Sequence, residues 1–163
     1  RQADALHNDI LSSDFTAAGY ATWLRRMGVK YVFLPEAPLD WSGPREAAVL
    51  RSSPEFRQVW KDADWTVYRL SEPAPLAVSL DGGRDPTILA LLHQALYLQV
   101  PQAGDYLIKA TYSPYWDVTA GEGTLRPTAG GRFLVLHASA PGFYGIQVRV
   151  TVQASLRELV QLF

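Results

Sequence analysis

The chain contains no cysteine, one asparagine and three lysines among its 163 residues. The absence of cysteine excludes disulfide bonds and thiolate metal sites, and it leaves the cellular compartment open. Scarce lysine and asparagine beside abundant arginine are typical of a GC-rich bacterial genome, which is a hypothesis about codon usage. No apolar run approaches the roughly 20 residues that are needed to span a bilayer.

Net charge is also nearly absent. The formal value is −1, and acids and bases number ten and nine in residues 1–75 and five each in residues 76–153. Such a chain has no long-range field to attract nucleic acid or an anionic membrane, so we expect no nucleic-acid partner. No signal peptide is visible. Because the sequence begins at an arginine without a methionine, we expect a piece of a larger protein.

What is present is enough apolar material for a core. Hydrophobic residues make up 48% of the chain and five are tryptophan. Apolar side chains three to four residues apart after Asp14 predict an amphipathic helix, which Asp14 caps and Gly28 ends. The continuous β-prone run at residues 30–34 predicts a strand that is covered on both faces.

A second group of elements completes a small α/β module. Ser53 is expected to cap a helix whose inner face carries Phe56, Val59 and Trp60. Residues 65–70 alternate as a strand. A strand, short helices and a strand favour a partial βαβ unit.

Residues 71–75 contain two prolines and predict a stiff connector, so we place a domain boundary there, between modules 1–75 and 76–163. Alternation of apolar with small or polar residues from Tyr144 to Val152 predicts a strand with one buried and one wet face. Residues 85–95 fit either a helix or a buried strand, and residues 101–104 fit a hairpin loop. Further strands are predicted at residues 76–80, 96–100, 105–112, 116–120, 123–127 and 132–138.

Short strands at this spacing indicate an antiparallel, jelly-roll-like β-sandwich, and the whole chain is predicted to be α+β. Little chemistry accompanies this fold. There is no P-loop, dinucleotide fingerprint, nucleophile elbow or metal-ligand spacing, so we predict no cofactor, no metal and no catalytic residue. His137 alternates with Phe133 and Val135, which predicts a structural histidine on the core side. Asp62 and Asp64 fit an ordinary turn better than an acid–base pair.

The aromatic cluster at residues 112–116 is the best candidate site. Tyr112, Tyr115 and Trp116 could stack on a sugar ring, with Asp117 as a hydrogen-bond partner. The alternative, which we favour, is that these rings fill the core of the sandwich.

Several segments together resemble a known family. They are Trp23–Val32 (WLRRMGVKYV), Ser53–Phe56 (SPEF) with Trp65–Leu70 (WTVYRL), Tyr112–Trp116 (YSPYW), Gly130–Phe133 (GGRF) and Ala140–Gly142 (APG). In this combination they are similar to the extracytoplasmic part of polytopic bacterial membrane proteins of the GT-C glycosyltransferase and YfhO-like kind. The chain departs from the family pattern at Gly121-Glu122-Gly123, where Asp-Gly is more typical.

The resemblance implies a location on the extracytoplasmic face of a bacterial cell membrane. It implies the membrane portion of the parent protein as a partner, together with a glycan or a lipid-linked sugar. The catalytic acids of such enzymes lie in membrane-adjacent loops that have no counterpart here, so none is carried over. The expected function is a non-catalytic domain for partner, acceptor or polymer recognition. The alternative is a carbohydrate-binding sandwich that uses the aromatic cluster.

Overall fold

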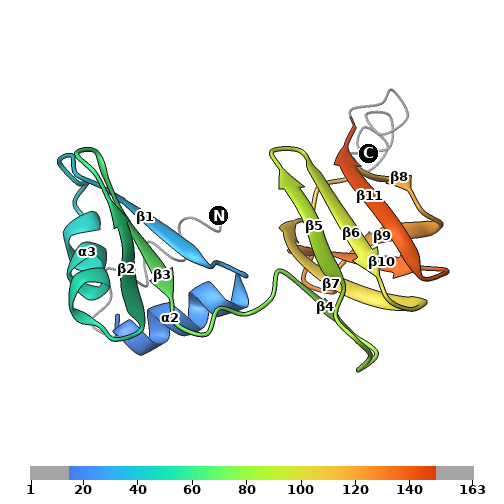
Figure 1. Cartoon of the computed structure of the whole chain (residues 1–163), viewed down its shortest axis with the longest axis horizontal. Helices are drawn as coiled ribbons and strands as arrows, with labels where there is room; N and C mark the ends of the chain where they lie inside the picture. Colours follow the sequence, from blue (N-terminus) through green and yellow to red (C-terminus); the bar gives the residue numbers. More distant parts are fainter. Residues whose placement is uncertain (1–14, 150–163) are drawn as a thin grey trace, which may run out of the picture. The chain divides into compact units, whose positions relative to one another are not determined.

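The computed structural model describes residues 15–149, which form two helices and eleven strands in three antiparallel sheets (Figure 1). The chain divides into two compact units, Arg1–Pro75 and Leu76–Phe163, called unit 1 and unit 2 below. Unit 1 packs helices on a small sheet and unit 2 stacks two sheets, so the predicted α+β class with a β-sandwich is confirmed.

Unit 1 has a three-stranded sheet in the order β1-β3-β2. Its elements are α2 (Ala17–Arg26), β1 (Tyr31–Pro35), α3 (Gly43–Ser52), β2 (Phe56–Lys61) and β3 (Trp65–Leu70). β1 pairs antiparallel with β3, so the partial βαβ unit predicted from these two strands is wrong. The physical reason is that the chain reverses direction once more in the hairpin turn between β2 and β3, so β3 runs opposite to β1.

The helix predicted over Phe56, Val59 and Trp60 is therefore also wrong. The spacing of these side chains fits a helix, but aromatic and β-branched residues also favour strands. The turn that follows decides between them, because the Asp62 carboxylate accepts hydrogen bonds from the backbone N–H groups of Asp64 (2.9 Å) and Trp65 (2.8 Å). This Asx-type turn folds β2 back onto β3 as a hairpin.

Helix α2 has well-formed ends. The Thr16 hydroxyl accepts a hydrogen bond from the Gly19 N–H at 3.1 Å and is the N-cap; the predicted cap, Asp14, lies outside the described residues. Gly28 has φ 71° and its N–H donates to the Arg25 carbonyl, while the Val29 N–H donates to the Leu24 carbonyl. These two bonds form a Schellman motif, which confirms Gly28 as the residue that ends the helix.

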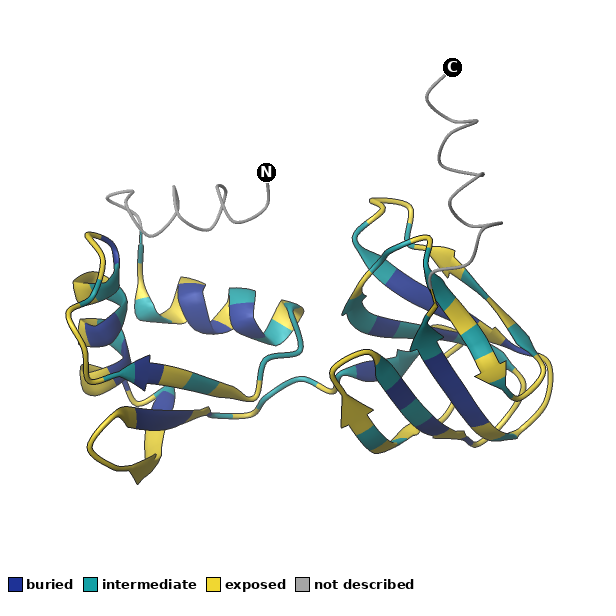
Figure 2. Ribbon diagram, turned by 90° about the horizontal axis from the view of Figure 1, so that it is seen from above, coloured by how far each residue is buried: buried dark blue, intermediate teal, exposed yellow. Residues whose placement is uncertain are grey.

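Both helices of unit 1 contribute to one core on one side of the sheet (Figure 2). The core consists of Tyr20, Ala21, Leu24, Leu34, Ala47, Leu50, Phe56, Tyr68 and Leu70. On β1 only Leu34 is buried, while Tyr31 and Phe33 are exposed. The prediction that this strand is covered on both faces is therefore wrong, since both helices lie on the same face.

Arg25 fixes the point at which the chain leaves this sheet. Its guanidinium pairs with Glu55 at 2.6 Å and donates to the carbonyls of Ser71 (2.7 Å) and Glu72 (3.1 Å). Glu72 has φ 49°, the only positive value of a non-glycine residue among residues 15–149. The two hydrogen bonds from Arg25 to the carbonyls of Ser71 and Glu72 hold this unfavourable backbone conformation.

Unit 2 is a sandwich of two four-stranded sheets, β4-β7-β10-β9 and β5-β6-β11-β8. Its strands are β4 (Ala77–Ser79), β5 (Thr87–Leu92), β6 (Ala95–Val100), β7 (Gly104–Thr111), β8 (Trp116–Ala120), β9 (Gly123–Pro127), β10 (Phe133–Ala138) and β11 (Gly142–Val148). The buried positions of both sheets form one core between them (Figure 2). Its largest members are Tyr106, Tyr144, Leu96, Leu98, Ile108, Leu134, Leu136 and Ile146.

Three predictions for unit 2 are decided by the strand assignments. Residues 85–95 contain the strand β5 and a turn at His93 and Gln94, and no helix. The hairpin predicted around residues 101–104 is wrong, because β6 and β7 belong to different sheets and this connection crosses between them. The alternation predicted from Tyr144 onward is confirmed as far as Val148, and Val150 and Val152 lie outside the described residues.

Candidate recognition surfaces

The predicted aromatic site is divided between the inside and the outside of the sandwich. Tyr112 and Trp116 pack against the core of unit 2, and the Trp116 indole N–H donates to the Thr111 carbonyl at 3.0 Å. Asp117 is the next residue along β8, so it points to the opposite side of the sheet and is exposed. The sugar platform stays a prediction, and Asp117 does not lie on the same face as Trp116.

Tyr115 lies in the loop that precedes β8. Its backbone N–H donates to the Ser113 hydroxyl at 3.3 Å, and its carbonyl accepts from the Arg149 N–H at 2.7 Å. Both bonds tie the loop to its own turn and to the residue that follows β11. The backbone bonding of Tyr115 is therefore that of a residue that shapes this end of the sandwich.

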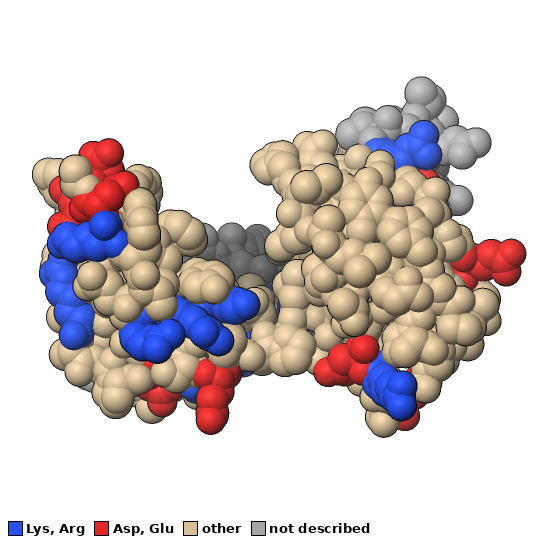
Figure 3. Space-filling model, in the orientation of Figure 1, with Lys and Arg blue, Asp and Glu red and all other residues tan. Residues whose placement is uncertain are grey.

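The outer surface of the sheet β5-β6-β11-β8 is almost free of charge. Residues 86–104 and 133–148 contain no Lys, Arg, Asp or Glu, so strands β5, β6 and β11 have none. The exposed fractions of Leu89, Leu91, Leu92 and Phe143 are 53%, 64%, 58% and 48%. We call these four residues the leucine face. Leu92 and Phe143 lie on the outer side of the sheet, opposite Ala95 and Gln99, whereas Leu91 lies opposite the core residue Leu96 and is exposed at the open edge of β5. Figure 3 shows the uncharged expanse over unit 2, while Lys and Arg gather on unit 1.

The leucine face continues along the outer surface of β6 and β11, where Tyr97 and Gln147 are held in place. Tyr97 and Phe143 stack with ring centroids 5.8 Å apart, and the Gln147 amide donates to the Tyr97 hydroxyl at 2.8 Å. These contacts fix the aromatic side chains on the outer surface of β6 and β11. Contiguous exposed apolar surface of this kind is typical of a site that contacts another molecule.

Unit 1 presents a second apolar surface, on the side of its sheet opposite the helices. Strand pairing aligns its side chains in three rows, which are Tyr31–Arg69–Arg57, Phe33–Val67–Trp60 and Pro35–Trp65. We call these eight residues the aromatic face. Phe33 is 61% exposed and Trp60 is 50% exposed, so their rings stand partly in solvent. This surface was not predicted from the sequence, because Trp60 was expected to lie in a helix.

Comparisons with protein-family models, with curated proteins and with solved structures each found no match. Among residues 15–149, no helix is long and apolar enough to cross a membrane, and no group of three or more potential ligands is placed to hold a metal ion.

His137 belongs to a polar cluster on the outer surface of the other sheet. It faces outward beside Asp105, at 2.8 Å, and the Asp105 carboxylate also accepts from Arg126 at 2.7 Å. Its predicted position on the core side is wrong, because Leu134 and Leu136 take the inner positions of β10. The hydrogen bonds from His137 and Arg126 lower the pKa of Asp105. The cluster is solvent-exposed, which is typical of a surface ion-pair network.

Three acidic residues of unit 1, Asp40, Glu46 and Asp62, are committed to local structure. Asp62 shapes the β2–β3 turn, and one Asp40 oxygen accepts from the N–H groups of Ser42 and Gly43 ahead of α3. Glu46 accepts a hydrogen bond from the Tyr20 hydroxyl. Burial raises the pKa of Tyr20, and the Glu46 carboxylate adds to the effect.

A cavity of about 260 Å³ lies between β1 and α3. Its polar groups include Asp40 and Glu46, whose side chains already hold the start of α3 and the Tyr20 hydroxyl. Each acid is thus engaged by a neighbour, and the cavity adds no free acid–base pair to the described part of unit 1.

Proposed function

We propose that the chain is a non-catalytic extracytoplasmic domain of a membrane-embedded, glycosyltransferase-like bacterial protein, and that it recognises a partner, an acceptor or a polymer. The leucine face is the observation that carries this proposal. Four large apolar side chains, each about half exposed, lie on strands that have no formal charge. Such a surface favours contact with an apolar partner, and the membrane portion of the parent protein is the partner we propose.

A second line of support is the resemblance of residues 20–152 to the extracytoplasmic parts of GT-C and YfhO-like proteins. The segments that carry it include Trp65–Leu70, which is β3, and Tyr112–Trp116, which leads into β8. These segments supply core side chains to both units, namely Tyr68, Leu70 and Trp116. A shared pattern of core residues supports a shared architecture and leaves ligand choice to the surface.

The location is tested by thiol labelling in whole cells. Because the chain has no cysteine, Arg84→Cys on the exposed loop before β5 introduces its only thiol. In cells that express the natural parent protein with this change, a membrane-impermeant maleimide should label the chain as fully before lysis as after it. Labelling that occurs only after lysis would place the chain on the cytoplasmic side and refute the proposal.

The contact is tested by photo-crosslinking in the same cells. A benzoylphenylalanine at Leu91, on the leucine face, should crosslink to membrane-embedded segments of the parent protein. The matched control is the same group at Arg126, on the charged outer surface of the other sheet. Equal crosslinking from both positions, or none from Leu91, would argue against the leucine face as the docking surface.

A further inference from the structure

The row of the aromatic face that contains two arginines has an unusual charge arrangement. Arg57 on β2 lies directly opposite Arg69 on β3, and Tyr31 lies on the other side of Arg69. Directly opposed residues on antiparallel strands have Cβ atoms about 5 Å apart, and like charges at that position destabilise the sheet. Among residues 15–149, neither guanidinium has a carboxylate within ion-pair distance.

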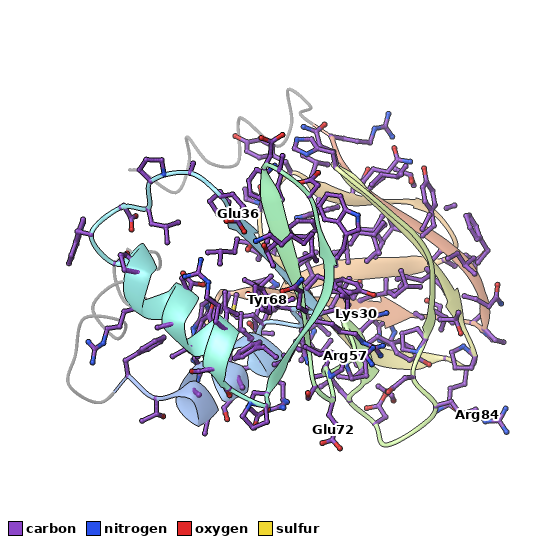
Figure 4. The ribbon with its side chains drawn as sticks, turned by 60° about the vertical axis from the view of Figure 1, so that its left-hand side comes forward. Lys30, Glu36, Arg57, Tyr68, Glu72 and Arg84 are labelled. Carbon is purple, nitrogen blue, oxygen red and sulfur yellow. The ribbon has the colours of Figure 1, made fainter. Side chains whose placement is uncertain are left out.

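A hollow lies beside this pair. Its volume is about 350 Å³, within the range of small-molecule sites, and it is lined by Arg57, Arg69, Leu70, Ser71 and Glu72. Figure 4 labels Arg57 and Glu72 in unit 1. The backbone of Ser71 and Glu72 is fixed by hydrogen bonds to Arg25, so this wall of the hollow is preorganised.

The two remaining rows of the aromatic face are uncharged. They continue from the arginine row in steps of about 7 Å, the repeat of two residues along a strand. Phe33 and Trp60 flank Val67 in the first of them, and Trp65 pairs with Pro35 in the second. Unit 1 therefore offers one site for an anionic group and, next to it, half-exposed rings for an uncharged body.

We propose that the aromatic face binds a glycan that carries a phosphate or carboxylate group. Two adjacent guanidiniums fit the oxygens of either anion in a forked geometry. The apolar C–H side of a sugar ring stacks on an exposed aromatic ring, and the Glu72 carboxylate at the rim can accept from a sugar hydroxyl. This rests on the proposed function, because it specifies the polymer or acceptor that the domain recognises.

Single-stranded nucleic acid is the competing ligand, and the arrangement of charge favours a glycan. A nucleic-acid strand has a phosphate at every nucleotide, and proteins that bind it place cations all along the groove. Here the cations gather at one end of the face, where Arg57 and Arg69 share a row and Lys30 lies 5.4 Å from the centroid of the Tyr31 ring, and the rows of Phe33 and Trp65 have none. An aliphatic chain would need an enclosing groove, whereas Phe33 and Trp60 stand partly in solvent.

Binding to the full chain is measured by NMR titration with maltotriose 1-phosphate, maltotriose, inorganic phosphate and an oligothymidylate. The sugar phosphate should bind at least 10-fold more tightly than maltotriose or phosphate, with shifts on β1, β2 and β3. Arg57→Gln and Arg69→Gln should each remove most of this advantage, and Arg84→Gln, in a loop of unit 2, should not. Trp60→Ala should weaken binding of the sugar phosphate while leaving that of inorganic phosphate unchanged.

A second readout is independent of the ligand. Because Arg57→Gln removes a like-charge contact, it should raise the urea midpoint of unfolding while it lowers affinity. Binding that survives both arginine substitutions, the absence of binding by the sugar phosphate, or tighter binding of the oligothymidylate would each overturn the proposal. The outcome is separable from thiol labelling in cells, since the titration reports ligand chemistry and the labelling reports location.

Discussion

The two outer faces of the sandwich in unit 2 have opposite chemistry on the same scaffold. The face of β4-β7-β10-β9 carries an ion-pair network of Asp105, Arg126 and His137, whereas the other face carries exposed leucines and only one formal charge, Asp117. Both sheets bury their inner residues equally well in the shared core. The fold therefore does not require the leucine face, and its apolar character points to an external partner.

The edge strand β5 sharpens this contrast. It has no charged residue, and sheets usually protect such an edge with lysine, proline or a bulge. A register shift between Ile88 and Ala90 is the protection present here, together with Pro86 just ahead of the strand. The end of β5 beyond the bulge, which contains Leu91 and Leu92, is the least protected part of the described sandwich.

The largest effect on stability is expected at Trp116, a residue of the predicted aromatic site that packs against the core. If Trp116 belongs to the core, Trp116→Ala should lower the free energy of unfolding by about 3–5 kcal/mol. Its exposed neighbour Asp117 gives the matched control, and Asp117→Ala should change stability by less than about 0.5 kcal/mol. Urea unfolding followed by circular dichroism measures both. A stable Trp116→Ala variant that has lost binding to a glycan would instead assign this residue to a sugar platform.

A smaller effect on stability, but a clear effect on the hydrophobicity of the surface, is expected for the leucine face. The double change Leu91→Ser and Leu92→Ser should alter the unfolding free energy by less than about 1 kcal/mol, because both side chains are more than half exposed. Retention on a hydrophobic-interaction column should fall markedly. Val78→Ser, on the other outer face, serves as the control, and equal loss of retention there would mean that the two faces do not differ in this respect.

The smallest effect is expected in the ion-pair network, and it depends on pH. The folded-state pKa of Asp105 is lowered, so its contribution is present above the usual aspartate value of about 4 and is lost as pH falls through the lower folded value. Because the group is exposed, the contribution should stay below about 1 kcal/mol. Asp105→Asn should therefore be less stable than the parent chain at pH 7, and the difference should vanish near pH 2. A difference that is constant with pH would contradict this account.

Unit 2 was predicted well from sequence because its signals agree with one another. The predicted ranges 116–120 and 123–127 match β8 and β9 residue for residue, since Gly121 and Gly123 flank Glu122 in the connection between these strands, which belong to different sheets. Connections were harder to predict. Residues 101–104 have the composition of a hairpin turn, but which sheet each flanking strand joins is decided by the packing of distant residues.

The error in unit 1 had a local cause with a long-range consequence. Residues 56–60 satisfy a helical spacing, and the hydrogen bonds of the Asp62 turn decide in favour of the strand. Assigning a helix there hid the pairing of Arg57 with Arg69, and with it the aromatic face. Of the candidate residues in unit 2, Tyr112 and Trp116 could be recognised as ring-bearing core residues, but the charge-free run behind the leucine face was the stronger surface signal.

The bonds from Arg25 to Ser71 and Glu72 also define where unit 1 is complete. Strand β3 finishes at Leu70, yet a polypeptide truncated there would leave the guanidinium without two of its carbonyl acceptors and would remove one wall of the hollow. The smallest self-sufficient version of this unit should thus reach Glu72. A fragment series that stops at positions 70, 72 and 75 would show thermal melting recover at the second of these.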